Sequence, residues 1–308
     1  MKKRTLLALA GIFYLAGCQT LDSDAIKTGE KQYPIRFSLQ LKEEIVSFPS
    51  VRSIPDLSIP DPIKTNKSPE AGDNLFSKIE YIVYDNSENP EKFIRHKQFT
   101  SADDDFTIIY DSLPAGNYKI AFLAHSSEVV ELSGNMFKSD QVSDAFHVCE
   151  IISVGTNDIN KSIELKRVVS RIEFVSEEMV PATLKSFDIE VKPYFNQINI
   201  FTGEGATQTN TYTFPHLFTD EEKGTNNFTH NFYTFIPSGN QTISATLIAT
   251  GNDESQHKRE VGNITPVINK IIRYKGKLYS PKSPDETFSL SVINNGAWDQ
   301  PDNDIPLE

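Results

Sequence analysis

Cysteine is scarce in this sequence, with 2 in 308 residues. Cys18 ends an N-terminal apolar segment, where the neighbouring residues indicate a modification rather than a disulfide partner. Cys149 then remains as a single thiol inside the apolar run 146–152, where a small thiol is typically buried and inert. The sequence therefore excludes a disulfide-stabilised fold, and stability has to come from packing.

Recognisable motifs of catalysis and of metal or cofactor binding are also lacking. The 6 histidines include no pair three or four residues apart, and neither His-Glu-x-x-His nor Cys-x-x-Cys occurs. Gly-x-Ser-x-Gly is absent, and Gly203-Glu204-Gly205 is too short and too acidic to hold a phosphate. We therefore expect no enzyme, no catalytic residue, no metal and no cofactor, and a secreted hydrolase is the weakest alternative.

Positive charge and long hydrophobic runs are in short supply. The chain has 30 Lys and Arg against 42 Asp and Glu, a formal net charge of -12, and it lacks the clustered basic residues that neutralise phosphates. We therefore expect no nucleic-acid partner. The apolar stretch Leu6–Ala16 is about half of the roughly 20 residues that a membrane-spanning helix needs, so a permanent span is not expected.

The N-terminus has the features of a lipoprotein signal peptide over residues 1–17. Three basic residues follow Met1, and the apolar stretch after them ends in small residues. Leu15-Ala16-Gly17-Cys18 resembles the bacterial lipobox, which predicts cleavage between Gly17 and Cys18 and acyl chains such as palmitate on Cys18. Each buried methylene contributes about 0.8 kcal/mol to membrane anchoring. The alternative is an ordinary signal peptide with an incidental cysteine.

The residues just after Cys18 bear on the destination of the protein. Gln19 differs from the aspartate associated with inner-membrane retention, and Asp22 and Asp24 resemble the acidic export signal of Bacteroidetes surface lipoproteins. We therefore expect a lipid-anchored protein of the cell outer membrane, exposed at the surface.

The chain after the signal begins with a tether, a strand and a long loop. Residues 18–32 are polar and aperiodic, as in a flexible lipidated tether. Apolar and polar residues alternate from Ile35 to Leu41, which predicts a strand with one buried face. Prolines recur between residues 42 and 74 and disfavour a central strand or helix there, so a long exposed loop is expected.

Short segments bounded by turn residues, rich in β-branched and aromatic residues in the first half and alternating in the second, predict an all-β protein. In the first half their spacing suggests a meander, and they fall at 79–84, 93–99, 106–110 and 118–124. In the second half they fall at 162–175, 184–191, 198–201, 232–236, 243–249, 271–279 and 288–293. A helical period appears only weakly, around residues 141–148. The economical interpretation is two tandem antiparallel β-sandwich domains, at 33–160 and 161–308.

These landmarks, taken in order, resemble the fimbrillin superfamily, the subunits and anchors of Bacteroidetes fimbriae. The resemblance is carried by the lipobox at Cys18, the strand 79–85, Ala115-Gly116-Asn117-Tyr118-Lys119-Ile120-Ala121, and Ile163-Glu164-Leu165-Lys166-Arg167-Val168-Val169-Ser170-Arg171-Ile172. Near the C-terminus, residues 269–279, the next strand and Trp298 are similar to the family's closing hairpin. The resemblance implies two transthyretin-like sandwich domains and a role in fimbria (pilus) assembly and cell adhesion.

The resemblance also implies assembly by β-strand donation, with other fimbrial subunits as partners. An N-terminal strand is removed, and an extended segment of another subunit fills the groove that it leaves. Here Ile35–Leu41 would be the removable strand, and an arginine-specific protease would cut between Arg52 and Ser53 in the following loop. The alternatives are that Arg52 is an ordinary loop residue and that the protein, uncut, remains a lipid-tethered anchor. The acidic tail 299–308 favours an anchor or accessory subunit, because it would make a poor donor strand.

A second class of function stays open in the sequence. A surface lipoprotein that binds glycans for a polysaccharide-uptake system would also be acylated, acidic and rich in β-sandwiches. Such proteins usually present several exposed aromatic side chains, whereas Trp298 is the only tryptophan and lies near the chain end. Glycan binding would therefore have to use tyrosine or phenylalanine.

Overall fold

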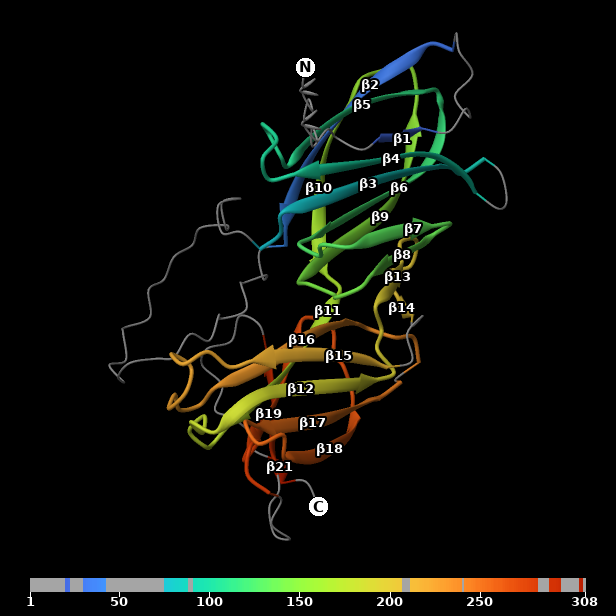
Figure 1. Ribbon diagram of the computed structural model, residues 1–308. Helices are drawn as coiled ribbons and strands as arrows, with labels where there is room; N and C mark the ends of the chain where they lie inside the picture. The colour runs from blue at the N-terminus through green and yellow to red at the C-terminus, as the bar shows by residue number, and fades with distance from the viewer. Residues whose placement is uncertain are drawn as a thin grey trace, which may run out of the picture.

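The computed structural model describes residues 20–22, 30–42, 75–87, 91–206, 211–239, 241–281, 288–294 and 305–306. All regular secondary structure in these ranges is β-strand, β1 to β21, and no helix occurs in them (Figure 1). The predicted all-β class, built from β-sandwiches, is confirmed. Strands of the first half lie at one end of an elongated molecule and strands of the second half at the other (Figure 1).

The first half is a sandwich whose two sheets are joined through one strand. One sheet has the order β1-β4-β3-β6-β9, the other has the order β10-β2-β5, and β10 pairs with β2 along most of its length and with β9 at its end. The strands are β1 (Thr20–Asp22), β2 (Gln32–Leu41), β3 (Lys78–Asp85), β4 (Lys92–Thr100), β5 (Ile108–Pro114), β6 (Gly116–His125), β9 (Ala145–Val154) and β10 (Ile159–Arg167).

The second half is also a sandwich. One sheet has the order β16-β11-β19-β20-β21, and the other has the order β15-β12-β17-β18. The strands are β11 (Val169–Ser176), β12 (Leu184–Lys192), β15 (Tyr212–Leu217), β16 (Thr229–Phe235), β17 (Ile243–Gly251), β18 (Gln256–Ile264), β19 (Lys270–Gly276), β20 (Ser289–Asn294) and β21 (Ile305–Pro306).

The two halves repeat one topology. In each half one early strand lies between a parallel and an antiparallel partner: β2 between β10 and β5, and β11 between β19 and β16. The opposite sheets, β4-β3-β6-β9 and β15-β12-β17-β18, use corresponding strands in the same order. The other named strand pairs in the described part of the chain are antiparallel.

Alternation along the strands places the apolar side chains in two clusters. One cluster fills the first-half sandwich and includes the fully buried rings of Phe37, Tyr81 and Phe122. Strand β3 is buried on both faces, so its alternate residues Ile82 and Tyr84 belong to the other cluster. That cluster continues into the second-half sandwich, so apolar packing runs unbroken across the junction of the halves.

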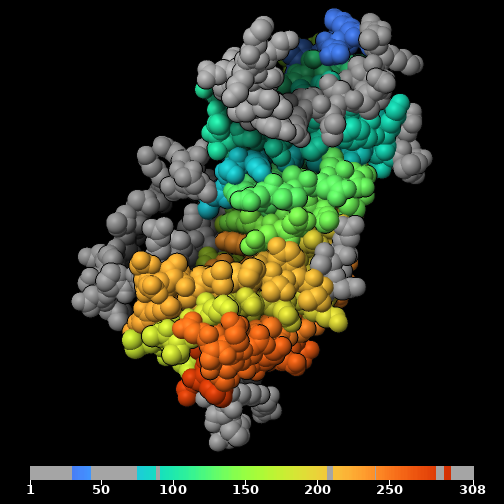
Figure 2. Space-filling model, viewed as in Figure 1, coloured from blue at the N-terminus to red at the C-terminus, as the bar shows by residue number. Residues whose placement is uncertain are grey.

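A small sheet of order β14-β13-β8-β7 joins the halves. Strands β7 (Val130–Ser133) and β8 (Met136–Ser139) come from the first half, and β13 (Gln197–Asn199) and β14 (Gly205–Ala206) from the second. Because β8 pairs directly with β13, backbone hydrogen bonds cross the junction. The first-half and second-half surfaces meet along this band in Figure 2.

Side-chain hydrogen bonds reinforce the junction. The Val142 N–H donates to the Tyr194 hydroxyl at 2.8 Å, and His147 Nε2 lies 2.9 Å from the Ile200 carbonyl oxygen. Arg167, at the end of β10, donates to both carboxylate oxygens of Asp144 at 2.7 and 2.8 Å and to Asn269 Oδ1 at 2.8 Å. Arg167 thus links the last strand of the first half to a loop of the second.

Two sequence predictions about individual strands are wrong. Residues 145–148 begin strand β9 instead of continuing a helical period, and Ala145, Phe146 and His147 are all buried because both faces of β9 are covered there. The predicted meander breaks at β5, which pairs with β2 in the opposite sheet.

The structure also adds detail at the predicted domain edges. Strand β10, which the sequence places at the start of the second domain, pairs with β2 and β9, so the sheets of the first half extend to Arg167. Within the predicted tether 18–32, β1 pairs with the edge of β4. Among the described residues no helix is long and apolar enough to cross a membrane.

Candidate assembly site

The candidate site is centred on β2, the strand that the sequence predicts as removable. Ile35, Phe37 and Leu39 are buried, and the side chains between them are half-buried or exposed. Because successive side chains of a strand point to opposite faces, the three apolar residues enter the first-half core together. Each such side chain stabilises the fold by about 1.5–3 kcal/mol when fully buried.

Both backbone edges of β2 are paired. The strand runs parallel to β10 from Ile35↔Ile159 to Leu41↔Leu165 and antiparallel to β5 from Gln32↔Pro114 to Ser38↔Ile108. Its removal would leave rows of backbone donors and acceptors on β10 and β5 beside an apolar trough. An extended segment from another chain could satisfy both at once.

The floor of this trough is aromatic and contains a buried charge cluster. The Phe37 ring centroid lies 5.1 Å from that of Phe122 and 6.1 Å from that of Tyr81. The Tyr81 hydroxyl donates to Asp111 Oδ2 at 2.8 Å, and Asp111 also accepts from Lys97 Nζ at 3.0 Å and from Arg95. Burial, together with the Asp111 carboxylate, raises the pKa of Tyr81 well above its usual value.

The outer face of β2 is held more weakly. Arg36 donates to Asn160 Oδ1 at 3.0 Å and to the Tyr110 hydroxyl at 3.4 Å, and Tyr110 is 60% exposed. The Ser112 hydroxyl donates to Gln32 Oε1 at 2.6 Å. Exposed polar contacts of this kind contribute little because water competes for the same groups. The inner face and the backbone therefore hold β2 in place.

The residues predicted to process and anchor the protein lie outside the described ranges. These are Gly17 and Cys18 for signal cleavage and lipidation, and Arg52 and Ser53 for protease processing. Trp298 lies outside them as well. Their assignments stay predictions.

Sequence reasoning missed a buried carboxylate on the other face of β3. Glu80 is fully buried, with Oε2 2.5 Å from His96 Nε2 and Oε1 3.1 Å from His125 Nε2, and Gln98 donates to Oε1 at 2.6 Å. His125 Nδ1 accepts from the Ser127 N–H at 3.1 Å, so its Nε2 carries the proton that Glu80 accepts. Burial alone would raise the pKa of Glu80, but hydrogen bonds from His125 and His96 outweigh it and lower the pKa to about 2.

The signal for this cluster was a lone acidic residue inside the apolar run 79–84. A buried charge needs partners, but the partners lie on β4 and β6 and cannot be read from spacing. Among the described residues, no group of three or more His, Cys, Asp or Glu side chains is arranged to hold a metal ion.

Cys149 lies on β9, half-buried against the apolar cluster of the junction. Burial raises the pKa of its thiol to about 11. This environment is that of a structural thiol, since a reactive cysteine needs a lowered pKa.

The geometry defines a β-sandwich protein in which β2, near the start of the first half, lies between two partner strands. The chain belongs to a family of unknown function, DUF6562, which it matches over residues 28–278. The comparison with curated proteins gave no match.

The solved structures that resemble this chain include proteins of Bacteroides and Porphyromonas species. A candidate adhesin from Bacteroides ovatus has a TM-score of 0.50 and 11% identity, over 80% of this chain and 87% of that one. A candidate polysaccharide-binding protein from Bacteroides thetaiotaomicron has a TM-score of 0.51 and 9% identity, over 86% of this chain and 96% of that one. The tip fimbrial protein Mfa3 from Porphyromonas gingivalis has a TM-score of 0.42 and 8% identity, over 86% of this chain and 100% of that one. At these identities the likeness concerns the fold alone.

Proposed function

We propose that this chain is a cell-surface adhesion protein of fimbrial type, assembled with other fimbrial subunits by exchange of strand β2. The observation that carries the proposal is the position of β2, which is N-terminal, buried on one face and paired along both edges. A strand in this position can be replaced only by another strand with the same alternation. The role is structural, with no catalysis and no nucleic-acid partner.

Two further findings support the proposal. The ordered landmarks of the sequence resemble the fimbrillin superfamily, and the B. ovatus protein of similar fold is a candidate adhesin. In this proposal the lipid on Cys18 places the protein on the outer membrane, and cleavage after Arg52 releases the lipid and frees β2 in one event. Without cleavage the protein serves as an anchor or accessory subunit at the membrane.

The terminus of the mature protein tests the processing. Intact mass and the N-terminal residue would be determined on protein from purified outer membranes, with and without an inhibitor of arginine-specific proteases. An acylated Cys18 terminus under both conditions identifies an anchor. A Ser53 terminus that appears only with active protease identifies a polymerising subunit. An unmodified terminus at any other residue contradicts both the anchor and the subunit interpretation.

An engineered, reducible disulfide between β2 and β5, called here the β2–β5 lock, tests the exchange itself. Arg36 and Tyr110 lie directly opposite on β2 and β5 and point outward. The Arg36→Cys/Tyr110→Cys variant, made with Cys149→Ala, places two cysteines at the separation that a disulfide requires. Under oxidising conditions we expect no denaturant-resistant polymers, and reduction should restore them.

A matched lock in the second half provides the control. Glu190 and Thr213 lie opposite each other on β12 and β15, away from β2. Glu190→Cys/Thr213→Cys should polymerise equally well oxidised or reduced. Polymers formed by the oxidised β2–β5 lock would show that β2 stays in place during assembly and would refute the exchange.

A further inference from the structure

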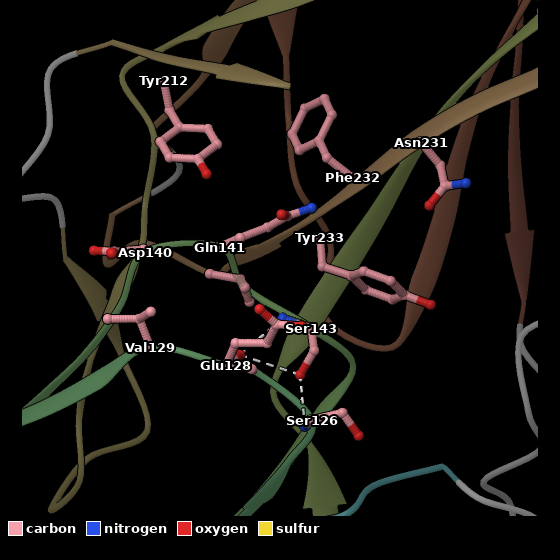
Figure 3. A pocket seen from close by; sticks show the side chains of 12 residues that line it. Ser126, Glu128, Val129, Asp140, Gln141, Ser143, Tyr212, Asn231, Phe232 and Tyr233 are labelled. Atoms are coloured by element: carbon pink, nitrogen blue, oxygen red, sulfur yellow. Dashed lines mark hydrogen bonds between the residues drawn. The ribbon is translucent and has the colours of Figure 1, made fainter. Parts of the chain in front are cut away.

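A cavity of about 480 Å³ opens at the junction of the two halves (Figure 3). The first half contributes residues 126–129 after β6 and residues 140–143 before β9. The second half contributes Tyr212 at the start of β15 and residues 231–233 of β16. This volume lies within the range of about 300–1,000 Å³ that is typical of small-molecule sites.

The first-half wall of the cavity is polar and partly pre-organised. The Ser143 hydroxyl accepts from the Ser126 N–H at 2.8 Å and from the Ser127 hydroxyl at 3.2 Å, and it donates to the Asp144 carbonyl oxygen at 3.0 Å. The Ser143 N–H donates to the Ser127 hydroxyl at 3.2 Å. These bonds fix the backbone of both wall segments relative to each other.

The opposite wall carries the aromatic rings of Tyr212 and Tyr233, which Figure 3 shows across the cavity from the serines. The Phe232 ring is only 2% exposed and stacks on Phe214 in the core, so it supports this wall from behind. Tyr212 is held by its neighbours, since its ring centroid lies 5.0 Å from that of Tyr194 and 4.7 Å from that of Phe214. Burial, with the charge of Asp140 nearby, raises the pKa of Tyr212, so its hydroxyl stays protonated at neutral pH and can donate.

The rim supplies planar polar groups. Gln141 and Asn231 are exposed, and within the described residues neither side-chain amide has a hydrogen-bond partner. Glu128 and Asp140 add two carboxylates, and no Lys, Arg or His occurs among the described residues that line the cavity. A negatively charged ligand is therefore disfavoured, and the mixed lining does not suit a wholly apolar ligand.

We propose that this junction cavity binds one or two units of a neutral saccharide. A neutral sugar presents hydroxyl groups that pair with amides, carboxylates and serine hydroxyls, and it presents C–H faces that pack on aromatic rings. The cavity offers both kinds of group on facing walls. The inference adds a ligand to the proposed surface role, but it uses residues remote from β2 and does not depend on strand exchange.

Both halves are required for this site, because each supplies one wall. The Arg167–Asp144 pair and the Tyr194–Val142 hydrogen bond hold the walls at a fixed separation. A rigid, preformed cavity loses little entropy when a ligand enters.

The test uses saturation-transfer NMR and calorimetry on the full chain. The probes are galactose, mannose, N-acetylglucosamine and their β-linked disaccharides, with glucuronic acid as the anionic and glucosamine as the cationic comparison. We expect at least one neutral probe to bind and glucuronic acid to fail. Gln141→Ala/Asn231→Ala should weaken the neutral probe about tenfold or more, as expected for two lost hydrogen bonds.

A matched double variant removes the same two side-chain types elsewhere. Asn157 and Gln256 are exposed and distant from the cavity lining, so Asn157→Ala/Gln256→Ala should bind like the wild type. The proposal is overturned if no neutral probe binds, if glucosamine alone binds, or if the two double variants bind equally. The Gln141→Ala/Asn231→Ala variant should still form polymers as the wild type does. Loss of saccharide binding with normal polymer formation would therefore separate the cavity from strand exchange.

Discussion

Glu80 shows how one buried carboxylate links the fold to pH. It is fully buried, and its partners His96, His125 and Gln98 come from β4 and β6 on either side of β3. With the folded pKa lowered to about 2, the ionised form is strongly favoured in the native protein. Protonation of Glu80 at a given pH therefore requires more free energy in the native state than in the unfolded chain.

This shift gives a stability prediction with a definite sign. A carboxylate whose pKa is lowered by folding stabilises the protein above its unfolded pKa, and the stabilisation disappears as the pH falls through the folded value. Between about pH 5 and pH 2 the wild type should lose roughly 3 kcal/mol through Glu80. Urea unfolding across this range should show a shallower pH dependence for Glu80→Gln. Glu164→Gln, at an exposed position, should follow the wild type, and equal slopes for all three proteins would contradict the assignment.

Cys149 gives a second prediction for a single residue. Because burial raises its pKa to about 11, only a small fraction is thiolate at mildly alkaline pH. Iodoacetamide should modify Cys149 tens of times more slowly than an exposed thiol, as followed by peptide-resolved mass spectrometry. Ser133→Cys on β7 supplies the exposed reference. Equal rates at the two positions would show that β9 opens readily.

At the scale of elements, β2 should stabilise the protein mainly through the side chains of its buried face. Phe37→Ala removes a fully buried ring and should destabilise the protein by about 3–5 kcal/mol. Ser38→Ala, one residue further on the outer face, should change the free energy of unfolding by less than about 0.5 kcal/mol. Denaturant titration measures both. A small loss for Phe37→Ala would mean that β2 contributes little to the core.

Elements were easier to predict from the sequence than their partners. Alternation located β2 and β12, and β-branched and aromatic content between turn residues located β3, β4 and β6. Neither signal located β9, whose first residues, Ala145 to His147, are buried on both faces. Pairing of β5 with β2 and of β8 with β13 depends on contacts distant in sequence, which no local pattern encodes. Strand β2 of the candidate site was predicted because its alternation is local. Tyr81 and Asp111, which lie beneath it, were not predicted because their contact with β2 depends on strands distant in sequence.

At the scale of the whole molecule, the junction should make the two halves unfold together. Apolar packing is continuous across it, and β8 and β13 share backbone hydrogen bonds. We expect one calorimetric transition, with equal van't Hoff and calorimetric enthalpies. Two resolved transitions would mean that the shared sheet couples the halves only weakly.

The buried pair Arg167–Asp144 should matter to this coupling. The Arg167 side chain is 0% exposed and that of Asp144 is 12% exposed. Arg167→Met leaves Asp144 buried without its main partner and should destabilise the protein by about 3–5 kcal/mol. Arg167→Met/Asp144→Asn removes both charges and should lie closer to the wild type in denaturant unfolding. Equal losses for the single and double variants would show that the charge pair is not the source of the effect.

The repeated topology has the form that duplication of an ancestral sandwich would produce, and the two copies have diverged at one connection. Residues 42–77 join β2 to β3, whereas residues 177–183 join the corresponding strands β11 and β12. Strand β11 also continues directly from β10 through Val168. Strand β11 is therefore connected closely at both ends, by Val168 to β10 and by seven residues to β12. The first copy has a long connection on one side of β2, which is the arrangement that the proposed exchange of β2 requires.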